Sequence, residues 1–180
     1  MLANLRALFG VVVDIILLRR GPEQVPASTV LLALTVAIYL AISAMVIASL
    51  AAKDPSWPVQ LIIGAVSMLI WYRVALRIAN KSERYPQTLT AIFGVSTIFS
   101  PLLFPMTNSL LAQVQAKQQP SQFFTMLALF LVAWMIVVFV RIVRAAFEWP
   151  WPAALLLVIG EWIFSVLLFV MVYGAPSGAT

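Results

Sequence analysis

The chain contains no cysteine and no histidine, and only 9% of its 180 residues are charged. Without cysteine there are no disulfides, no thiolate nucleophiles and no sulfur ligands for a metal. Without histidine the chain lacks the commonest metal ligand and the usual base for an activated serine. These absences argue against the enzymes that depend on such groups. We therefore expect a non-enzymatic protein with no metal and no cofactor.

Apolar residues take the place of the missing polar ones. They make up 63% of the chain, and the mean hydropathy is +1.05. Soluble domains are about 45–50% apolar and about 25% charged. A soluble fold of this size could not bury so large an apolar fraction, so the excess must face lipid. The sequence predicts an integral membrane protein, and membrane topology explains its net charge of +5 better than binding to nucleic acid does.

Five segments are long and apolar enough to cross a bilayer, which takes about 20 residues of α-helix. They are apolar on all sides, whereas barrel strands alternate over about 10 residues. A helix also satisfies its own backbone polar groups in lipid. The predicted fold is all-α, a polytopic membrane helical bundle of five transmembrane helices. They form a domain over residues 28–180, with spans at about 28–52, 57–76, 88–111, 122–140 and 152–173.

Residues 1–27 have a different pattern and are predicted to form an amphipathic interfacial helix and a connector. Arg6, Gly10 and Asp14 are spaced four apart, which puts a narrow polar stripe on a mostly apolar helix. Arg19 to Pro22 then give a stop signal. We expect this helix to lie in the membrane interface. A sixth span is the alternative, and a cleaved signal peptide is disfavoured because Asp14 interrupts the apolar run.

The basic residues predict an orientation in the membrane. If the five spans alternate, nine of the eleven Lys and Arg fall on one side, and by the positive-inside rule that side is cytoplasmic. The N-terminal region would then be cytoplasmic and the C-terminus outside. The short loops and the lack of cysteine favour a bacterial inner membrane. The nine residues are Arg6, Arg19, Arg20, Arg73, Arg77, Lys81, Arg84, Arg141 and Arg144, against Lys53 and Lys117.

Glu161 is an acid inside the last span. It lies about nine residues beyond Pro152, or about 13 Å deep at 1.5 Å per residue, close to the midplane. Tyr39 and Ser100 come at similar depth, about eleven and twelve residues into spans that run in the same direction. We expect Glu161 to be protonated and hydrogen-bonded inside the bundle, because low dielectric disfavours a charged carboxylate. An embedded acid is a candidate functional site, but a structural hydrogen bond between helices is the favoured interpretation.

Pro101 and Pro105 lie four apart in the third span. Each removes a helix donor and crowds the carbonyl four residues earlier, so together they are a candidate helix break. Broken helices form binding sites in transporters, although a static kink is the more frequent outcome.

The overall layout resembles the Yip (Ypt-interacting protein) family of small five-span membrane proteins, which has bacterial members. The resemblance rests on topology and on the lead-in "LLRRGPEQVPAS" before the first span. The acidic "DLYGP"-like motif of the eukaryotic members is absent, so binding to small GTPases is not implied. The resemblance implies a protein that organises or assists a membrane assembly, with lipid and other membrane proteins or further copies of itself as partners. The alternative is a small transporter or channel in which Glu161 and the Pro101–Pro105 break form the site.

Overall fold

The computed structural model describes residues 2–50, 56–119 and 121–173, and within these ranges it describes the side chains of residues 9 to 172. These ranges contain α-helices and short 3-10 turns and no β-strand, which confirms the predicted all-α fold. The 3-10 turns are Pro22–Gln24 and Ser82–Arg84. The helices are α1 (Leu2–Ile16), α2 (Thr29–Ala48), α3 (Trp57–Ile78), α4 (Tyr85–Gln115), α5 (Gln122–Phe147) and α6 (Trp151–Tyr173).

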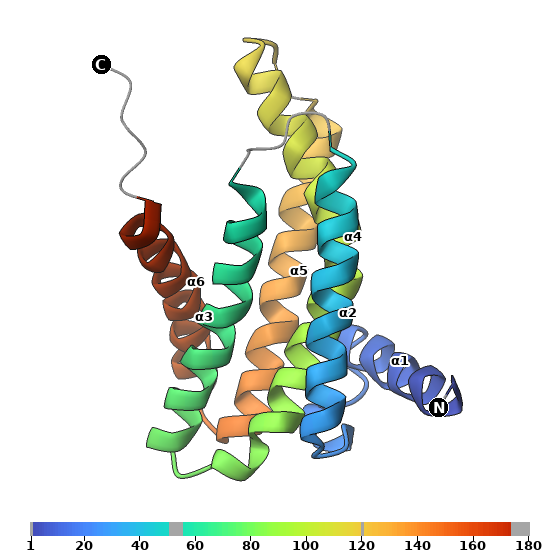
Figure 1. Cartoon of the computed structure of the whole chain (residues 1–180), viewed down its shortest axis with the longest axis vertical. Coiled ribbons are helices and arrows are strands. Elements are labelled where there is room, and N and C mark those ends of the chain that lie inside the picture. The colour runs from blue at the N-terminus through green and yellow to red at the C-terminus, as the bar shows by residue number, and fades with distance from the viewer. Residues whose placement is uncertain (1, 51–55, 120, 174–180) are drawn as a thin grey trace.

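Helices α2 to α6 are each long and apolar enough to cross a membrane, as predicted. They run alternately up and down, joined by short connections, whereas α1 leaves the bundle at a steep angle (Figure 1). With 15 residues α1 is only about 22 Å long, too short for a hydrocarbon core of about 30 Å. The chain is therefore an integral membrane protein with five spanning helices and a separate N-terminal helix.

Helix α4 is the centre of the bundle. Every residue from 88 to 96 is buried, so neighbours cover all sides of this part of the helix. Phe99 and Ser100 are buried as well, but none of residues 101–115 is. Helix α2 lies beside α4 over much of its length (Figure 1). The core is thus concentrated in one half of the bundle.

Helix α1 is fixed to this core by α4 and α5. A Cβ built on Gly94 of α4 would lie only 2.8 Å from a methyl group of Val12, so glycine allows α1 to approach closely. Trp134 of α5 donates its indole N–H to the carbonyl of Ile16 at 3.1 Å. Asp14 pairs with Arg20 at 2.9 Å. The side chain of Arg6, the first charged residue of this segment, lies outside the described residues.

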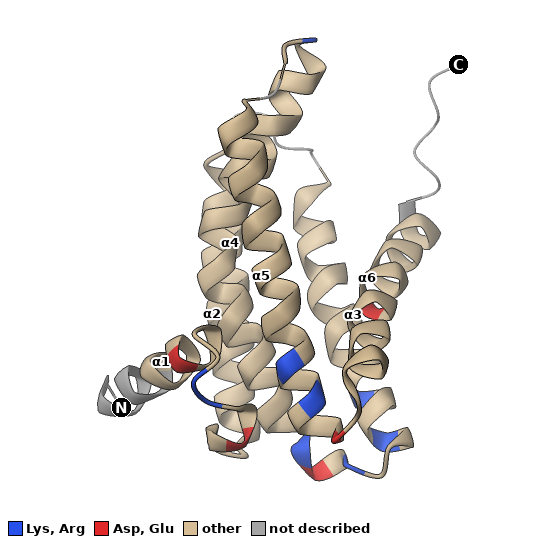
Figure 2. Cartoon of the chain, turned by 180° about the vertical axis from the view of Figure 1, so that it is seen from behind, with Lys and Arg blue, Asp and Glu red and all other residues tan. Residues whose placement is uncertain are grey.

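The basic residues gather toward one end of the bundle, which we call the basic end (Figure 2). Here Arg84 donates to the carbonyls of Ala145 and Ala146 in the last turn of α5, both at 3.1 Å. Arg84 and Lys81 also pair with Glu148, at 2.6 and 2.5 Å. Hydrogen bonds from Lys81 and Arg84 hold the pKa of the Glu148 carboxyl below its usual range. These contacts tie the α3–α4 connection to the turn between α5 and α6.

Candidate polar site and adjoining cavity

Glu161 lies on α6 and faces α3. It is 3% exposed, and the Ser67 hydroxyl of α3, itself fully buried, lies 3.1 Å from its Oε1 atom. The predicted hydrogen bond inside the bundle is therefore present. The prediction missed Ser67 because depths were compared only among the spans that run in the same direction as α6. Counted from Trp57 at the opposite end, Ser67 is also about ten residues deep.

The Ser67 hydroxyl has two close acceptors. Its Oγ atom lies 2.9 Å from the carbonyl of Gly64 as well as 3.1 Å from Glu161. A hydroxyl has one proton to donate and two lone pairs that accept. Both contacts are hydrogen bonds if Glu161 is protonated and donates to Ser67, while Ser67 donates to Gly64. The protonated state of Glu161 stays a prediction, and this geometry accommodates it.

A close approach of α3 and α6 holds Glu161 over Ser67. Trp71 of α3 donates its indole N–H to the carbonyl of Leu157 at 3.1 Å, and its ring lies 5.4 Å from that of Phe164. A Cβ on Gly160 would come within 2.8 Å of the same indole ring. Glycine at position 160, one residue before the acid, therefore allows the Trp71 ring to lie close to α6.

The other two residues of the predicted polar site lie on two other helices of the bundle. Tyr39 of α2 packs against Phe93 of α4, with ring centroids 5.3 Å apart. Ser100 donates to the carbonyl of Thr97 in its own helix at 3.3 Å. Glu161 is thus hydrogen-bonded to Ser67 rather than to either residue proposed from depth. Similar depth did not make either of them a hydrogen-bond partner of the acid, although Tyr39 lies close enough to Glu161 to interact with it electrostatically.

Helix α4 does not break at the prolines. It is a single helix from Tyr85 to Gln115 with both Pro101 and Pro105 inside it. Proline at 101 removes the N–H that would bond to the Thr97 carbonyl, and the Ser100 hydroxyl donates to that carbonyl instead. Side-chain hydrogen bonds of this kind let membrane helices continue through proline.

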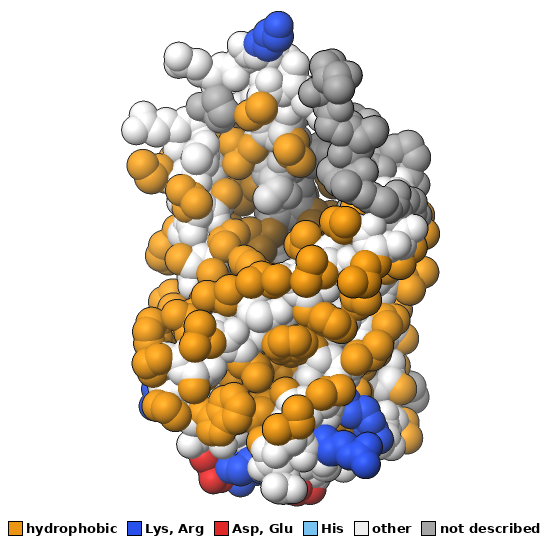
Figure 3. All heavy atoms as spheres, turned by 90° about the vertical axis from the view of Figure 1, so that its left-hand side faces the viewer, with side chains coloured by type: hydrophobic (Ala, Val, Ile, Leu, Met, Phe, Trp, Pro, Cys, Tyr) orange, Lys and Arg blue, Asp and Glu red, His pale blue; other side chains and the backbone are white. Residues whose placement is uncertain are grey.

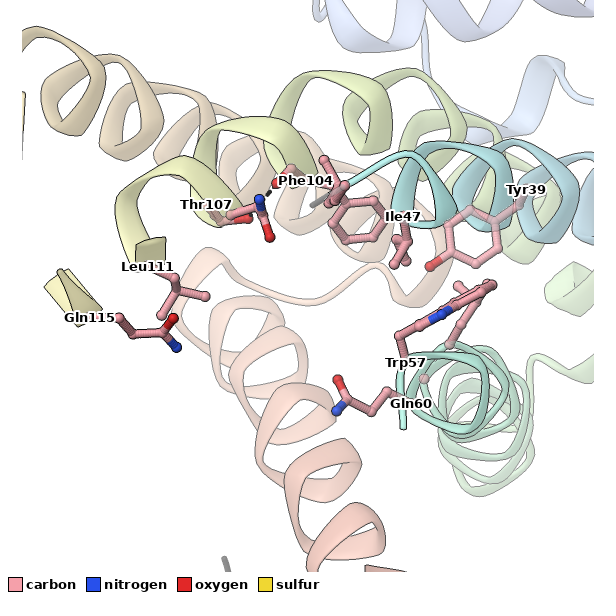
Figure 4. A pocket seen from close by; sticks show the side chains of 12 residues that line it. Tyr39, Ile47, Trp57, Gln60, Phe104, Thr107, Leu111 and Gln115 are labelled. Carbon is pink, nitrogen blue, oxygen red and sulfur yellow. Dashed lines mark hydrogen bonds between the residues drawn. The ribbon is translucent and has the colours of Figure 1, made fainter. Parts of the chain in front are cut away.

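A cavity of about 750 Å³ opens between α2, α3 and α4 in the half of the bundle away from the basic end. Figure 4 shows the Tyr39 hydroxyl and the Gln60 amide directed toward it. Gly64 also lines the cavity, and its carbonyl is bonded to Ser67. The cavity and the Ser67–Glu161 pair are therefore separated by less than one turn of α3. The lining residues are Tyr39, Ile47, Leu50, Trp57, Gln60, Leu61, Gly64, Phe104, Thr107, Asn108, Leu111 and Gln115.

The fold and this site define an α-helical integral membrane protein with one buried acid and a neighbouring cavity. Among the residues that the structure describes, no three His, Cys, Asp or Glu side chains are grouped to hold a metal. No family model, no curated protein and no solved structure matches the chain. Its function must therefore be argued from the geometry.

Proposed function

We propose that this chain is a non-enzymatic membrane protein that assists a membrane assembly by binding another membrane protein along α6. The supporting observation is how little of α6 is covered. Only 11% of the residues in the most apolar 18-residue stretch of α6 are buried, against 56% in the corresponding stretch of the span that contains α4. A continuous apolar surface covers the side of the molecule that includes α6 (Figure 3). Its large exposed side chains on α6 include Leu156, Ile163, Val166, Leu167 and Met171.

The proposed partner is a transmembrane helix of another protein. Helices associate in lipid through close packing and occasional hydrogen bonds, since lipid is as apolar as the side chains it contacts. Helix α6 packs against α3, where Trp71 and Ser67 hold it, and also against α5, and the face away from these two helices is available for such packing. The resemblance to the five-span Yip family implies a role of the same kind, and lipid would cover the remaining apolar surface.

Site-specific cross-linking tests this role. A photoreactive residue would replace Ile163 on α6, which is 55% exposed, or Leu129 on α5, which is 61% exposed and serves as the matched control. We expect one discrete adduct with a second membrane protein from position 163 and none from position 129. Equal adducts from both positions, or adducts only with a second copy of this chain, would contradict the proposal.

A small transporter or channel is the second candidate function. The cavity favours it, because Gly64 in the cavity wall is bonded to Ser67 and Ser67 to Glu161. The continuous α4 weakens it, since the broken helix expected for such a site is absent. Reconstituted vesicles should then move protons or small solutes, and Glu161→Gln should stop the flux while the protein stays folded. No flux, or flux that this variant leaves unchanged, would remove this candidate.

We also propose that the basic end faces the cytoplasm of a bacterial inner membrane, with the C-terminus outside. The support is the positive-inside rule applied to the gathered Lys and Arg residues. Reporter tags inserted after Arg20 and placed at Thr180 should report opposite compartments. The same compartment for both would overturn the five-span topology.

A further inference from the structure

The cavity between α2, α3 and α4 differs in chemistry from an ordinary gap between membrane helices. Half of its twelve lining residues carry hydrogen-bonding side chains: Tyr39, Trp57, Gln60, Thr107, Asn108 and Gln115. The remaining wall is apolar. Ligand pockets typically enclose about 300–1,000 Å³ and combine apolar walls with a few polar groups that fix orientation. At about 750 Å³ this cavity falls within that range.

The lining indicates a ligand without charge. None of the described residues that line the cavity is Asp, Glu, Lys or Arg. Phosphates and carboxylates are usually held by Arg or Lys through charge-assisted hydrogen bonds, and cations by carboxylates. The Asn108 and Gln115 amides can each donate and accept, whereas the Gln60 amide already donates to the Ser56 hydroxyl at 2.8 Å. Amides therefore suit a ligand with hydroxyl groups, because a hydroxyl also both donates and accepts hydrogen bonds.

The arrangement of these side chains suits a sugar ring. Figure 4 shows Tyr39 and Trp57 close together, with Gln60 beside them on α3. The Gln115 side chain comes from the far end of α4, across the cavity. A pyranose ring has C–H faces that pack on aromatic rings and hydroxyl groups around its edge. Trp and Tyr can contact both parts of a sugar, because each has an apolar ring that packs on C–H groups and a polar N–H or O–H that hydrogen-bonds to hydroxyls.

The apolar wall indicates that the ligand also has a hydrocarbon part. Leu50, Leu61, Phe104 and Leu111 line the same cavity as the amides. Trp57 begins α3, where spanning helices meet the membrane surface and amphipathic rings are common. A molecule here would have its head at the surface and its chain directed toward lipid.

We propose that this cavity binds the uncharged, hydroxyl-rich head of a glycolipid. The head group could also be recognised as a free sugar, because the amide and aromatic contacts are the same. This site goes beyond the assembly role proposed above and does not depend on it. Binding is measured on the isolated chain, so its failure and the failure of the α6 cross-links are separate results.

Native mass spectrometry of the purified full-length protein tests the proposal. The protein would be equilibrated in micelles with equal amounts of monoglucosyl diacylglycerol and phosphatidylglycerol of the same chains, and in a second arm with free maltose. We expect retention of the glucosyl lipid over the anionic one. Displacement of the glucosyl lipid by maltose would support recognition of the sugar itself, and it would show that a sugar without a lipid chain is sufficient for binding. Equal retention of the two lipids, or preference for phosphatidylglycerol, would overturn the proposal.

Variants connect that binding to the cavity. The double variant Asn108→Leu with Gln115→Leu should weaken binding of the glucosyl lipid by about tenfold to thirtyfold, the effect of losing two ordinary hydrogen bonds. Gln118→Leu is the matched control, because it changes an exposed amide that does not line the cavity. Thr107→Val keeps the shape of the lining. Because the Thr107 hydroxyl already donates to the carbonyls of Leu103 and Phe104 in its own helix, it can only accept from the ligand, and about a twofold to threefold loss is expected. Unchanged binding in both cavity variants would place the lipid elsewhere and contradict the proposal.

Discussion

The two halves of α4 lie in the same apolar helix but in different surroundings. In the half near the basic end, residues 88–96 are buried on every side, and α1 packs on Gly94. In the other half, no residue from 101 to 115 is buried, and Phe104, Thr107 and Asn108 line a cavity. Since lipid offers apolar groups the same surroundings that a helix does, hydropathy cannot produce this difference. Close packing produces it, and we infer that one half stabilises the fold while the other is available for binding.

The largest effect should come from truncating the packed half. Phe93→Ala removes a fully buried ring that packs against Tyr39. In soluble cores such a change costs about 3–5 kcal/mol, and in lipid we expect about 2 kcal/mol because only the packing part is lost. Leu111→Ala, at a position 59% exposed, should change the free energy of unfolding by less than about 0.5 kcal/mol. Reversible unfolding in mixed SDS micelles measures both, and equal losses would refute the comparison.

Enlarging Gly94 should separate α1 from the packed half. An added Cβ would lie 2.8 Å from Val12, whose branched side chain has little freedom to move away. We expect Gly94→Leu to cost about 1–3 kcal/mol and to lengthen spin-label distances between α1 and α4. Gly10→Ala is the control, since nothing lies within 4 Å of its added Cβ. An unchanged α1–α4 distance in Gly94→Leu would show that this contact does not fix α1.

The hydrogen bond between Ser67 of α3 and Glu161 of α6 should contribute less to stability than the packing at Phe93 or Gly94. Ser67→Ala is expected to lower the free energy of unfolding by about 0.6 kcal/mol, the average for a hydrogen bond between membrane helices. Glu161→Gln should have a smaller effect, because its amide can still donate to the Ser67 hydroxyl. A double-mutant cycle of the two positions measures the coupling. Zero coupling would mean that the bond does not hold α6 to α3.

The smallest effect should come from Glu148, which is exposed at the basic end. Lys81 and Arg84 lower the pKa of its carboxyl below the unfolded value of about 4.3. The stabilisation is therefore present above the unfolded pKa and is lost as pH falls through the folded one. We expect Glu148→Gln to lower Tm slightly at pH 7, with its melting curve approaching that of the wild type under acid conditions. Glu83→Gln, which changes a nearby exposed acid outside this cluster, is the control and should leave Tm at pH 7 unchanged.

The sequence was sufficient for the fold class, because five long apolar segments leave a membrane helical bundle as the only arrangement that satisfies the backbone in lipid. It also indicated an internal hydrogen bond for Glu161. It could not identify Ser67, because depth along a helix does not tell which helices are adjacent. The continuous α4 was missed because the Ser100 hydroxyl replaces the donor that Pro101 removes. The cavity depends on side chains from three helices, and no local pattern predicts such a combination.

Thiol labelling tests the contrast between the two halves most directly, because the chain has no cysteine of its own. A single Asn108→Cys or Ser96→Cys variant would be treated in intact cells with a membrane-impermeant maleimide added from outside. We expect Asn108→Cys, in the cavity wall, to react readily, and Ser96→Cys, at a position 7% exposed, to react only after unfolding. Equal reaction at both positions, or no reaction of Asn108→Cys, would contradict the claim that α4 has one closely packed half and one open half.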